Sequence, residues 1–242
     1  MYAIFKRELF SFLSSMVAFI IIGIFLLASG ILLWFFPETS ILDYGYAELT
    51  SFFSLAPFLF MFLIPAVCMR TFAEERKEGT YILLATKPIS IWEIIFSKYL
   101  ACVVLLLLSL VPTLFYCFSI YKLGLPVGNM DGGATIGSYI GLFLLGAVYI
   151  SIGVFASSLT GNQIVAFAIA VFLTFVFYTG FDSLSKITEF QNIEVAIAGI
   201  GINAHYQSIS RGVIDARDLA YFLTVIFIFL SLTRIVIGGR KW

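Results

Sequence analysis

Six long runs of uncharged, mostly apolar residues dominate this sequence and limit what it can fold into. The first five contain no charged residue, and the sixth is interrupted only by Arg234 near its end. A helix needs about 20 such residues to cross about 30 Å of hydrocarbon, and helices are expected because backbone amides facing lipid must be satisfied within their own segment. The runs are Met16–Phe36, Phe52–Met69, Tyr99–Tyr121, Ile136–Phe155, Ile164–Phe181 and Leu219–Ile237.

The charge content agrees with this pattern. Of 242 residues, 61% are hydrophobic and 12% are charged, whereas soluble domains carry roughly a quarter charged residues. We therefore predict an all-α membrane protein in which residues 1–242 form a single domain of six transmembrane helices. The first run is too long for the apolar core of a signal peptide, so it is expected to be a retained span.

The positions of Lys and Arg predict the orientation. Loops on the cytoplasmic side of a membrane carry an excess of these residues, and a cytoplasmic N-terminus places ten of them inside and four outside. We expect a multi-pass protein of the inner membrane with both termini in the cytoplasm. The inside set is Lys6, Arg7, Arg70, Arg76, Lys77, Lys87, Lys98, Arg234, Arg240 and Lys241, and the outside set is Lys122, Lys186, Arg211 and Arg217.

Residues 1–15 precede the first run and have two unlike sides when placed on a helix. Arg7, Ser11 and Ser14 fall on the polar side, with Glu8 beside them. This amphipathic pattern predicts an interfacial helix lying along the membrane surface. The alternative is a simple extension of the first span into the cytoplasm. The apolar side consists of Tyr2, Phe5, Leu9, Phe12, Leu13 and Met16.

Residues 70–98 connect the second and third runs on the expected cytoplasmic side. The stretch Arg70–Glu78 is strongly polar without Gly or Pro, so the second helix is expected to continue beyond the membrane. Arg70 and Glu74 stand four residues apart and can pair on that helix. Gly79 is a suitable helix end.

A second short helix and a new start follow in the same connection. Thr80 can cap a short helix, Tyr81–Thr86, which Pro88 ends because a proline disfavours helical geometry at the residue before it, Lys87. Ser90 and Glu93 then form the capping box of the next helix. The predicted order is helix, break, short helix, break, helix.

Residues 182–218 form the longest expected external loop. Within it, the ten uncharged residues Val195–Ala204 are too few to span a membrane and predict a re-entrant or interfacial segment. Arg211 and Asp215 are expected to pair on a turn, with Asp218 near the start of the last helix. The single histidine, His205, is interpreted as structural.

Several motifs are absent from the sequence. It contains no phosphate-binding Gly-rich loop and no cluster with metal-ligand spacing, so we expect no nucleotide site, metal or other cofactor. The spans carry no ionisable residue deep in their interiors, which argues against a transporter driven by its own ion coupling. Gly137 and Gly141 give one Gly-x-x-x-Gly pattern, interpreted as a contact between helices of the same chain.

The stretch Phe72–Ser90, followed by Lys98, resembles the cytoplasmic loop of type-2 ATP-binding-cassette (ABC) exporter permeases. The shared features are a Glu before Gly79-Thr80, a Leu pair, Pro88 and the Lys opening the next span. The order of elements matches as well, so the resemblance covers essentially the whole chain. It implies that the region Gly79–Lys87 is a coupling helix docking on a separate ABC ATPase. The implied contact residues are Phe72, Glu74, Glu75, Gly79, Thr80, Leu83, Leu84, Lys87 and Pro88.

A narrower resemblance lies at His205–Asp218, which is similar to a segment of permease subunits associated with gliding motility. Those subunits are encoded with an ATPase and a second membrane component, which implies the same partners here. Related exporters without a motility role carry similar segments. This resemblance therefore indicates a subfamily without fixing the role.

Two functional hypotheses follow. The first is an exporter subunit without enzymatic activity, which forms a pathway with a second permease chain, identical or related, lined by the second and fifth spans by family analogy. Uncharged spans then favour a bulky or amphipathic substrate. The second hypothesis is a subunit that anchors an ATPase or transmits its motion without moving a solute. Both place the chain in a lipid bilayer, and neither involves nucleic acid.

Overall fold

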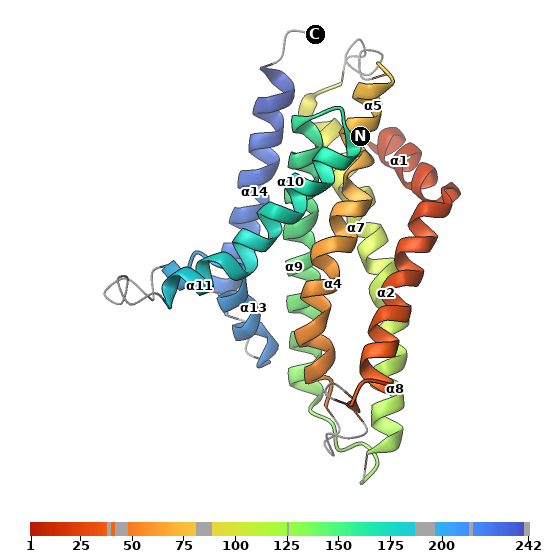
Figure 1. The fold of residues 1–242 in the computed structure, drawn as a ribbon, viewed down its shortest axis with the longest axis vertical. Coiled ribbons are helices and arrows are strands. Elements are labelled where there is room, and N and C mark those ends of the chain that lie inside the picture. Colours follow the sequence, from red (N-terminus) through yellow and green to blue (C-terminus); the bar gives the residue numbers. More distant parts are fainter. Residues whose placement is uncertain are drawn as a thin grey trace.

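A computed structural model describes residues 1–37, 40–41, 48–80, 89–124, 126–186, 197–212 and 215–239. In this part of the chain six helical segments are long and apolar enough to cross a membrane, and no strand is present. The predicted all-helical fold with six candidate spans is therefore confirmed. Figure 1 shows that the first helix and the end of the last helix lie at the same end of the bundle, which we call the terminal end. We call the opposite end the distal end.

The six candidate spans agree with the six apolar runs, and several are built from more than one helix. They consist of α2 (Met16–Trp34), α4 (Thr50–Cys68) with α5 (Arg70–Lys77), α7 (Ile91–Leu110) with η1 (Val111–Thr113) and α8 (Leu114–Leu123), α9 (Gly132–Leu159), α10 (Gln163–Phe175) with η2 (Val176–Gly180) and α11 (Phe181–Ser185), and α14 (Ala216–Gly238). Two shorter helices, α1 (Tyr2–Ser14) and α13 (Ile202–Ser210), precede the first and the last span.

The fourth span, α9, forms the centre of the bundle. Of its most apolar window 78% is buried, and it packs against α4, α7, α10, α13 and α14. Gly137 and Gly141 allow α13 to approach: a Cβ atom on Gly137 would lie 2.9 Å from backbone atoms of Ile209 and Gly212. The Gly-x-x-x-Gly pattern therefore mediates a contact within the chain, as the sequence predicts.

Replacing Gly137 with Ala is expected to destabilise the bundle by about 1 to 3 kcal/mol, because the new methyl group meets backbone atoms that cannot rotate away. The measurement is the unfolding midpoint of the purified chain in detergent, followed by tryptophan fluorescence. Gly132→Ala is the control, since a Cβ on Gly132 would meet no atom within 4 Å. Equal midpoints for the two variants would contradict the close contact with α13.

Two spans contain irregular turns that apolar runs alone do not predict. The third span changes to a 3-10 turn at Val111–Thr113, where Pro112 lacks the amide hydrogen that a continuous helix would use. The fifth span contains a π-helical stretch at Val176–Gly180. Such stretches are rare and occur frequently at functional sites.

The segment before the last span differs from its prediction. The predicted uncharged stretch is Val195–Ala204, whereas the helix α13 begins at Ile202 and extends six residues beyond that stretch, to Ser210. It is amphipathic and buries Ile202, Tyr206 and Ile209, so a search for uncharged residues alone misses it. Residues 187–196, including the beginning of the predicted segment, lie outside the described part of the chain.

The charged residues around α13 also differ from their predicted pairing. Asp215 caps α14 by accepting a hydrogen bond from the amide of Arg217, at 2.9 Å. No ion pair joins Arg211 to Asp215 in the described ranges, so that prediction is wrong. Asp218 instead contacts His205, with Oδ1 and Nδ1 2.6 Å apart. His205 thus joins α13 to α14, in agreement with its predicted structural role.

Candidate functional site

At the terminal end, α5 continues the direction of α4 after a break at Met69. Arg70 and Glu74 form the predicted pair through two hydrogen bonds of 2.9 and 3.1 Å. The helix ends at Lys77 with Glu78 as its C-cap, and Gly79 follows with a φ of 70°, a left-handed conformation that glycine adopts without strain. The predicted extension of the second helix and the role of Gly79 as its stop signal are therefore confirmed.

Ser157, near the end of α9, holds α5 at its break. Its Oγ accepts hydrogen bonds from the amides of Phe72 and Ala73, both at 3.0 Å, and donates to the carbonyl of Met69 at 2.9 Å. A helix start leaves its first amides without partners, and a helix end leaves its last carbonyls; the Met69 carbonyl follows the end of α4. One fully buried hydroxyl thus satisfies three of them and fixes α5 on the central helix.

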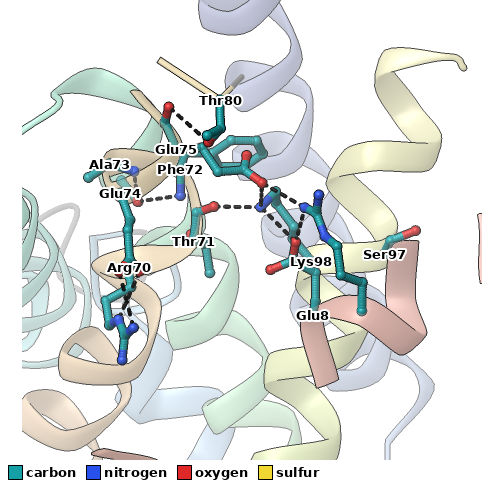
Figure 2. A network of polar contacts seen from close by, with 12 residues as sticks. Glu8, Arg70, Thr71, Phe72, Ala73, Glu74, Glu75, Thr80, Ser97 and Lys98 are labelled. Carbon is teal, nitrogen blue, oxygen red and sulfur yellow. Dashed lines mark hydrogen bonds and ion pairs between the residues drawn. The ribbon is translucent and has the colours of Figure 1, made fainter. Parts of the chain in front are cut away.

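Four charged residues from α1, α5 and α7 meet where these three helices come together (Figure 2). Lys98 of α7 is 1% exposed, and its Nζ lies 3.0 Å from Glu75 Oε1 and 3.2 Å from Glu8 Oε1. Arg7 of α1 contacts the same two carboxylates and lies 2.7 Å from Glu75. We call Arg7, Glu8, Glu75 and Lys98 the four-charge cluster; it joins α1, α5 and α7 and is neutral overall.

Further contacts hold the cluster in place. Lys98 also donates a hydrogen bond of 2.6 Å to the carbonyl of Thr71, and its Nζ lies 5.1 Å from the centre of the Phe72 ring. Arg70 reaches the turn between α1 and α2 and donates to Ser15 Oγ at 3.1 Å. The α5 helix therefore contacts both the middle of α1, at Arg7, and the end of α1, at Ser15.

The charges of the cluster stabilise one another. Burial by itself lowers the pKa of Arg7, but hydrogen bonds and charges of Glu8 and Glu75 outweigh it and raise that pKa above its ordinary value. Arg7 therefore stays cationic throughout the physiological pH range. Because a buried charge that loses its partner is strongly destabilising, the cluster favours the observed arrangement of the three helices over arrangements that separate them.

The predicted contact residues have different environments. Phe72 is fully buried beneath Lys98, so it cannot contact another protein directly and can act only through packing. Glu75 belongs to the four-charge cluster, whereas Glu74 pairs with Arg70 on another side of α5. Thr80 donates to the carbonyl of Glu75 at 3.4 Å. Leu83, Leu84, Lys87 and Pro88 lie outside the described residues.

The partners of Glu75 are not evident from the sequence pattern. Glu8 lies between Ile4 and Phe12, and these three residues, each four positions from the next, are the buried residues of α1. A carboxylate in the middle of a buried stripe requires a cation, and this is the signal that could have identified the site. The amphipathic pattern instead assigns Glu8 to a polar edge, while Tyr2 and Met16 of the predicted apolar side are exposed.

The predicted start of the third span is also confirmed. Ser90 and Glu93 form a capping box, in which the Ser90 side chain accepts from the amide of Glu93 and the Glu93 side chain accepts from the amide of Ser90. One turn later, Ser97 donates to the carbonyl of Met1 at 3.0 Å. The start of α7 is thereby fixed against the start of α1, and Lys98 follows directly.

The comparisons with known proteins bear on the whole bundle. A protein-family model described as ABC-2 family transporter protein matches residues 37–238, which include every candidate span except the first. No curated protein matches the chain.

Proposed function

Because this chain belongs to the ABC-2 family of transporter proteins and is a membrane-spanning permease subunit, we propose that it exports a solute using a separate ABC ATPase. We further propose that it acts as a dimer with a second permease chain, identical or related, since two-fold assembly is the common solution. The observation that carries the proposal is the four-charge cluster. It connects α5 to α1 and α7.

The proposed orientation places the terminal end in the cytoplasm of a cell with an inner membrane. The excess of Lys and Arg on that side supports it. The ATPase would then contact the chain just beyond α5, at Thr80 and at residues 81–88, which lie outside the described residues. Glu78 and Gly79 at the end of α5 are exposed and border this region.

Coupling in this proposal is mechanical. Nucleotide binding can shift the permease only if the ATPase closes better on one conformation than on another. A displacement of α5 cannot be absorbed locally, because the four-charge cluster and Ser157 join it to α1, α7 and α9. It is instead passed to the third and fourth spans, and to α1, which leads into the first span, as a shift of packed helices.

The alternative, a subunit that transmits motion without moving a solute, uses the same coupling contacts. A specific observation favours transport: a cavity of about 610 Å³, lined by both apolar and polar side chains, lies between α4 and the fifth span at the distal end. These are the second and fifth spans, which family analogy assigns to the pathway. A role in gliding motility, with an additional membrane component, is proposed only on the likeness of His205–Asp218 to such subunits.

Replacing Gly79 with Pro is expected to release the ATPase while the spans remain folded. Proline requires φ near −65° and cannot adopt the φ of 70° found here, so the chain after α5 leaves in a different direction. The tagged chain is purified from its own host in mild detergent, and bound ATPase is measured by ATP hydrolysis and mass spectrometry. Recovery should fall about tenfold, equivalent to about 1.4 kcal/mol of binding free energy.

Gly128→Pro is the matched control. Gly128 also has a positive φ, of 89°, and also donates its amide hydrogen, but it lies at the distal end. Unchanged recovery of the ATPase with Gly79→Pro, or equal losses with both variants, would contradict the proposed contact. Reversing the charge of Glu75 is a poorer test, because it also breaks the four-charge cluster.

A further inference from the structure

The cavity at the distal end is separate from the four-charge cluster. It is bounded by α4, the start of α9, the η2–α11 segment and α13, and has a volume of about 610 Å³. Figure 1 shows α10 and α11 slanting away from α4 toward this end. Phe58 of α4 and Tyr178 of η2 line the cavity and meet with their ring centres 5.5 Å apart. The cavity is therefore a chamber between the second and fifth spans.

The hydroxyl groups around the chamber present mainly acceptors. Six Ser and Thr hydroxyls line it, and each donates its only hydrogen to an oxygen of the protein, so that only lone pairs remain for a ligand. Five of these acceptor oxygens are backbone carbonyls, and the sixth belongs to the Glu48 carboxylate. The six residues are Thr50, Ser54, Thr135, Ser138, Thr179 and Ser210.

The charged side chains add to this excess of acceptors. Glu48, Asp131 and Asp182 line the chamber, and Arg211 is the only cationic residue among its described lining residues. Asp182 pairs through Oδ2 with the exposed Lys186, and Asp131 uses Oδ1 to cap α9. Each of these contacts, like that of Glu48 with Thr50, uses one of the two oxygens of its carboxylate. The lining also includes the amides of Asn203 and Gln207, which can donate, but three carboxylates face one guanidinium, so a positively charged ligand rich in hydrogen-bond donors fits this wall better than an anion.

The apolar part of the lining identifies the ligand further. Phe53, Phe58 and Tyr178 contribute aromatic rings; Phe58 is 46% exposed, whereas Phe53 and Tyr178 are buried in the wall. Aromatic faces attract organic cations, and ligand pockets combine such surfaces with a few polar groups. We propose that the chamber binds an organic ammonium compound with an apolar body, and, resting on the proposed function, that such compounds are the exported substrate class.

The test uses the full chain without an ATPase, in nanodiscs of phosphatidylcholine, with the aromatic cation ethidium as the probe. Binding is measured by fluorescence anisotropy, with empty nanodiscs as the blank. Ethidium is expected to bind saturably, and the anion anilinonaphthalene sulfonate is expected neither to bind there nor to compete. Stronger binding of the anion than of ethidium would overturn the inference.

Three variants and one control test how charge and aromatic surface affect the affinity for ethidium. Asp182→Asn should weaken ethidium binding about fivefold, and Arg211→Gln should strengthen it by a similar factor, since each removes one charge from a partly exposed wall. Phe58→Leu should weaken it about fivefold by removing a ring face. Glu78→Gln removes a carboxylate at the terminal end and should change nothing.

The results with these variants distinguish the proposed binding site from its absence. Shifts of the same sign for Asp182→Asn and Arg211→Gln, or an unchanged affinity in Phe58→Leu, would show that the chamber does not hold the probe and would overturn the inference. Because binding is measured on the chain alone, this failure leaves the ATPase contact untouched. Conversely, loss of the ATPase contact in the Gly79→Pro test would remove the assignment of the ligand as exported substrate, but not the binding site.

Discussion

Replacing Lys98 with Met should lower the free energy of unfolding by about 3 to 5 kcal/mol, because it leaves buried carboxylates without their central cation. Of the cations paired with Glu8 and Glu75 in the described part of the chain, Arg7 would remain, and the carbonyl of Thr71 would lose the Lys98 donor. The measurement is the unfolding midpoint in detergent. In the assembled transporter the same variant should weaken the stimulation of ATP hydrolysis by substrate, since α5 is no longer held to α1 and α7.

The control for this prediction is Lys186→Met. Lys186 also pairs with a carboxylate, Asp182 at 2.9 Å, but its side chain is 69% exposed, and such surface pairs contribute about 0 to 1 kcal/mol. A double-variant cycle with Glu75→Gln adds a second readout, because residues that share a cluster have non-additive effects. Equal midpoints for Lys98→Met and Lys186→Met would contradict the structural importance of the cluster.

Replacing Ser157 with Ala is expected to cost about 2 to 4 kcal/mol, since it leaves two buried amides and one carbonyl without their partner. The affected groups belong to Phe72, Ala73 and Met69 at the start of α5. Limited proteolysis should cleave the chain near α5 faster in the variant, while cleavage at the distal end keeps its rate.

Ser158→Ala is a close control for Ser157→Ala. Both serines are buried at the end of α9, but the Ser158 hydroxyl donates only to the Phe155 carbonyl of its own helix. Its removal should therefore cost little. If Ser158→Ala destabilised the chain as much as Ser157→Ala, the assigned role of Ser157 would be wrong.

Sequence patterns predict the spans well because a bilayer imposes a length on each apolar helix. The ends of α5 and α7 are equally local: Gly79 has the left-handed conformation expected of a helix end, and Ser90 with Glu93 forms the expected capping box. Such features depend on residues within one turn of each other. They can be predicted from neighbouring letters of the sequence alone.

The candidate site depends on contacts between residues far apart in the sequence. Glu8 and Lys98 are separated by 90 positions, and Phe72 and Ser157 by 85. No local pattern pairs them, and Lys98 alone indicates only the start of a span. Similarly, the extent of α13 is not evident from a search for uncharged runs, because its buried side chains alternate with polar ones.

Burial also changes how the predicted contact residues should be interpreted. The resemblance implies that Phe72, Glu74 and Glu75 contact the ATPase, yet Phe72 is fully buried and Glu75 is engaged with α1 and α7. We propose that these residues make the end of α5 rigid, and that the docking contact begins at Glu78. In this proposal the buried residues of α5 transmit the motion, and the exposed residues from Glu78 onward make the contact with the ATPase.

Cross-linking at the end of α5 in the assembled transporter tests whether this end of the helix contacts the ATPase. Glu78→Cys in the purified complex, treated with a short bifunctional maleimide, should give a permease–ATPase product, and addition of ATP should change its yield. Gly132→Cys at the distal end should give none, and in intact cells with a permeable outer envelope it should react with an impermeant maleimide. A cross-link to the ATPase from position 132 and none from position 78 would contradict an ATPase contact at the end of α5.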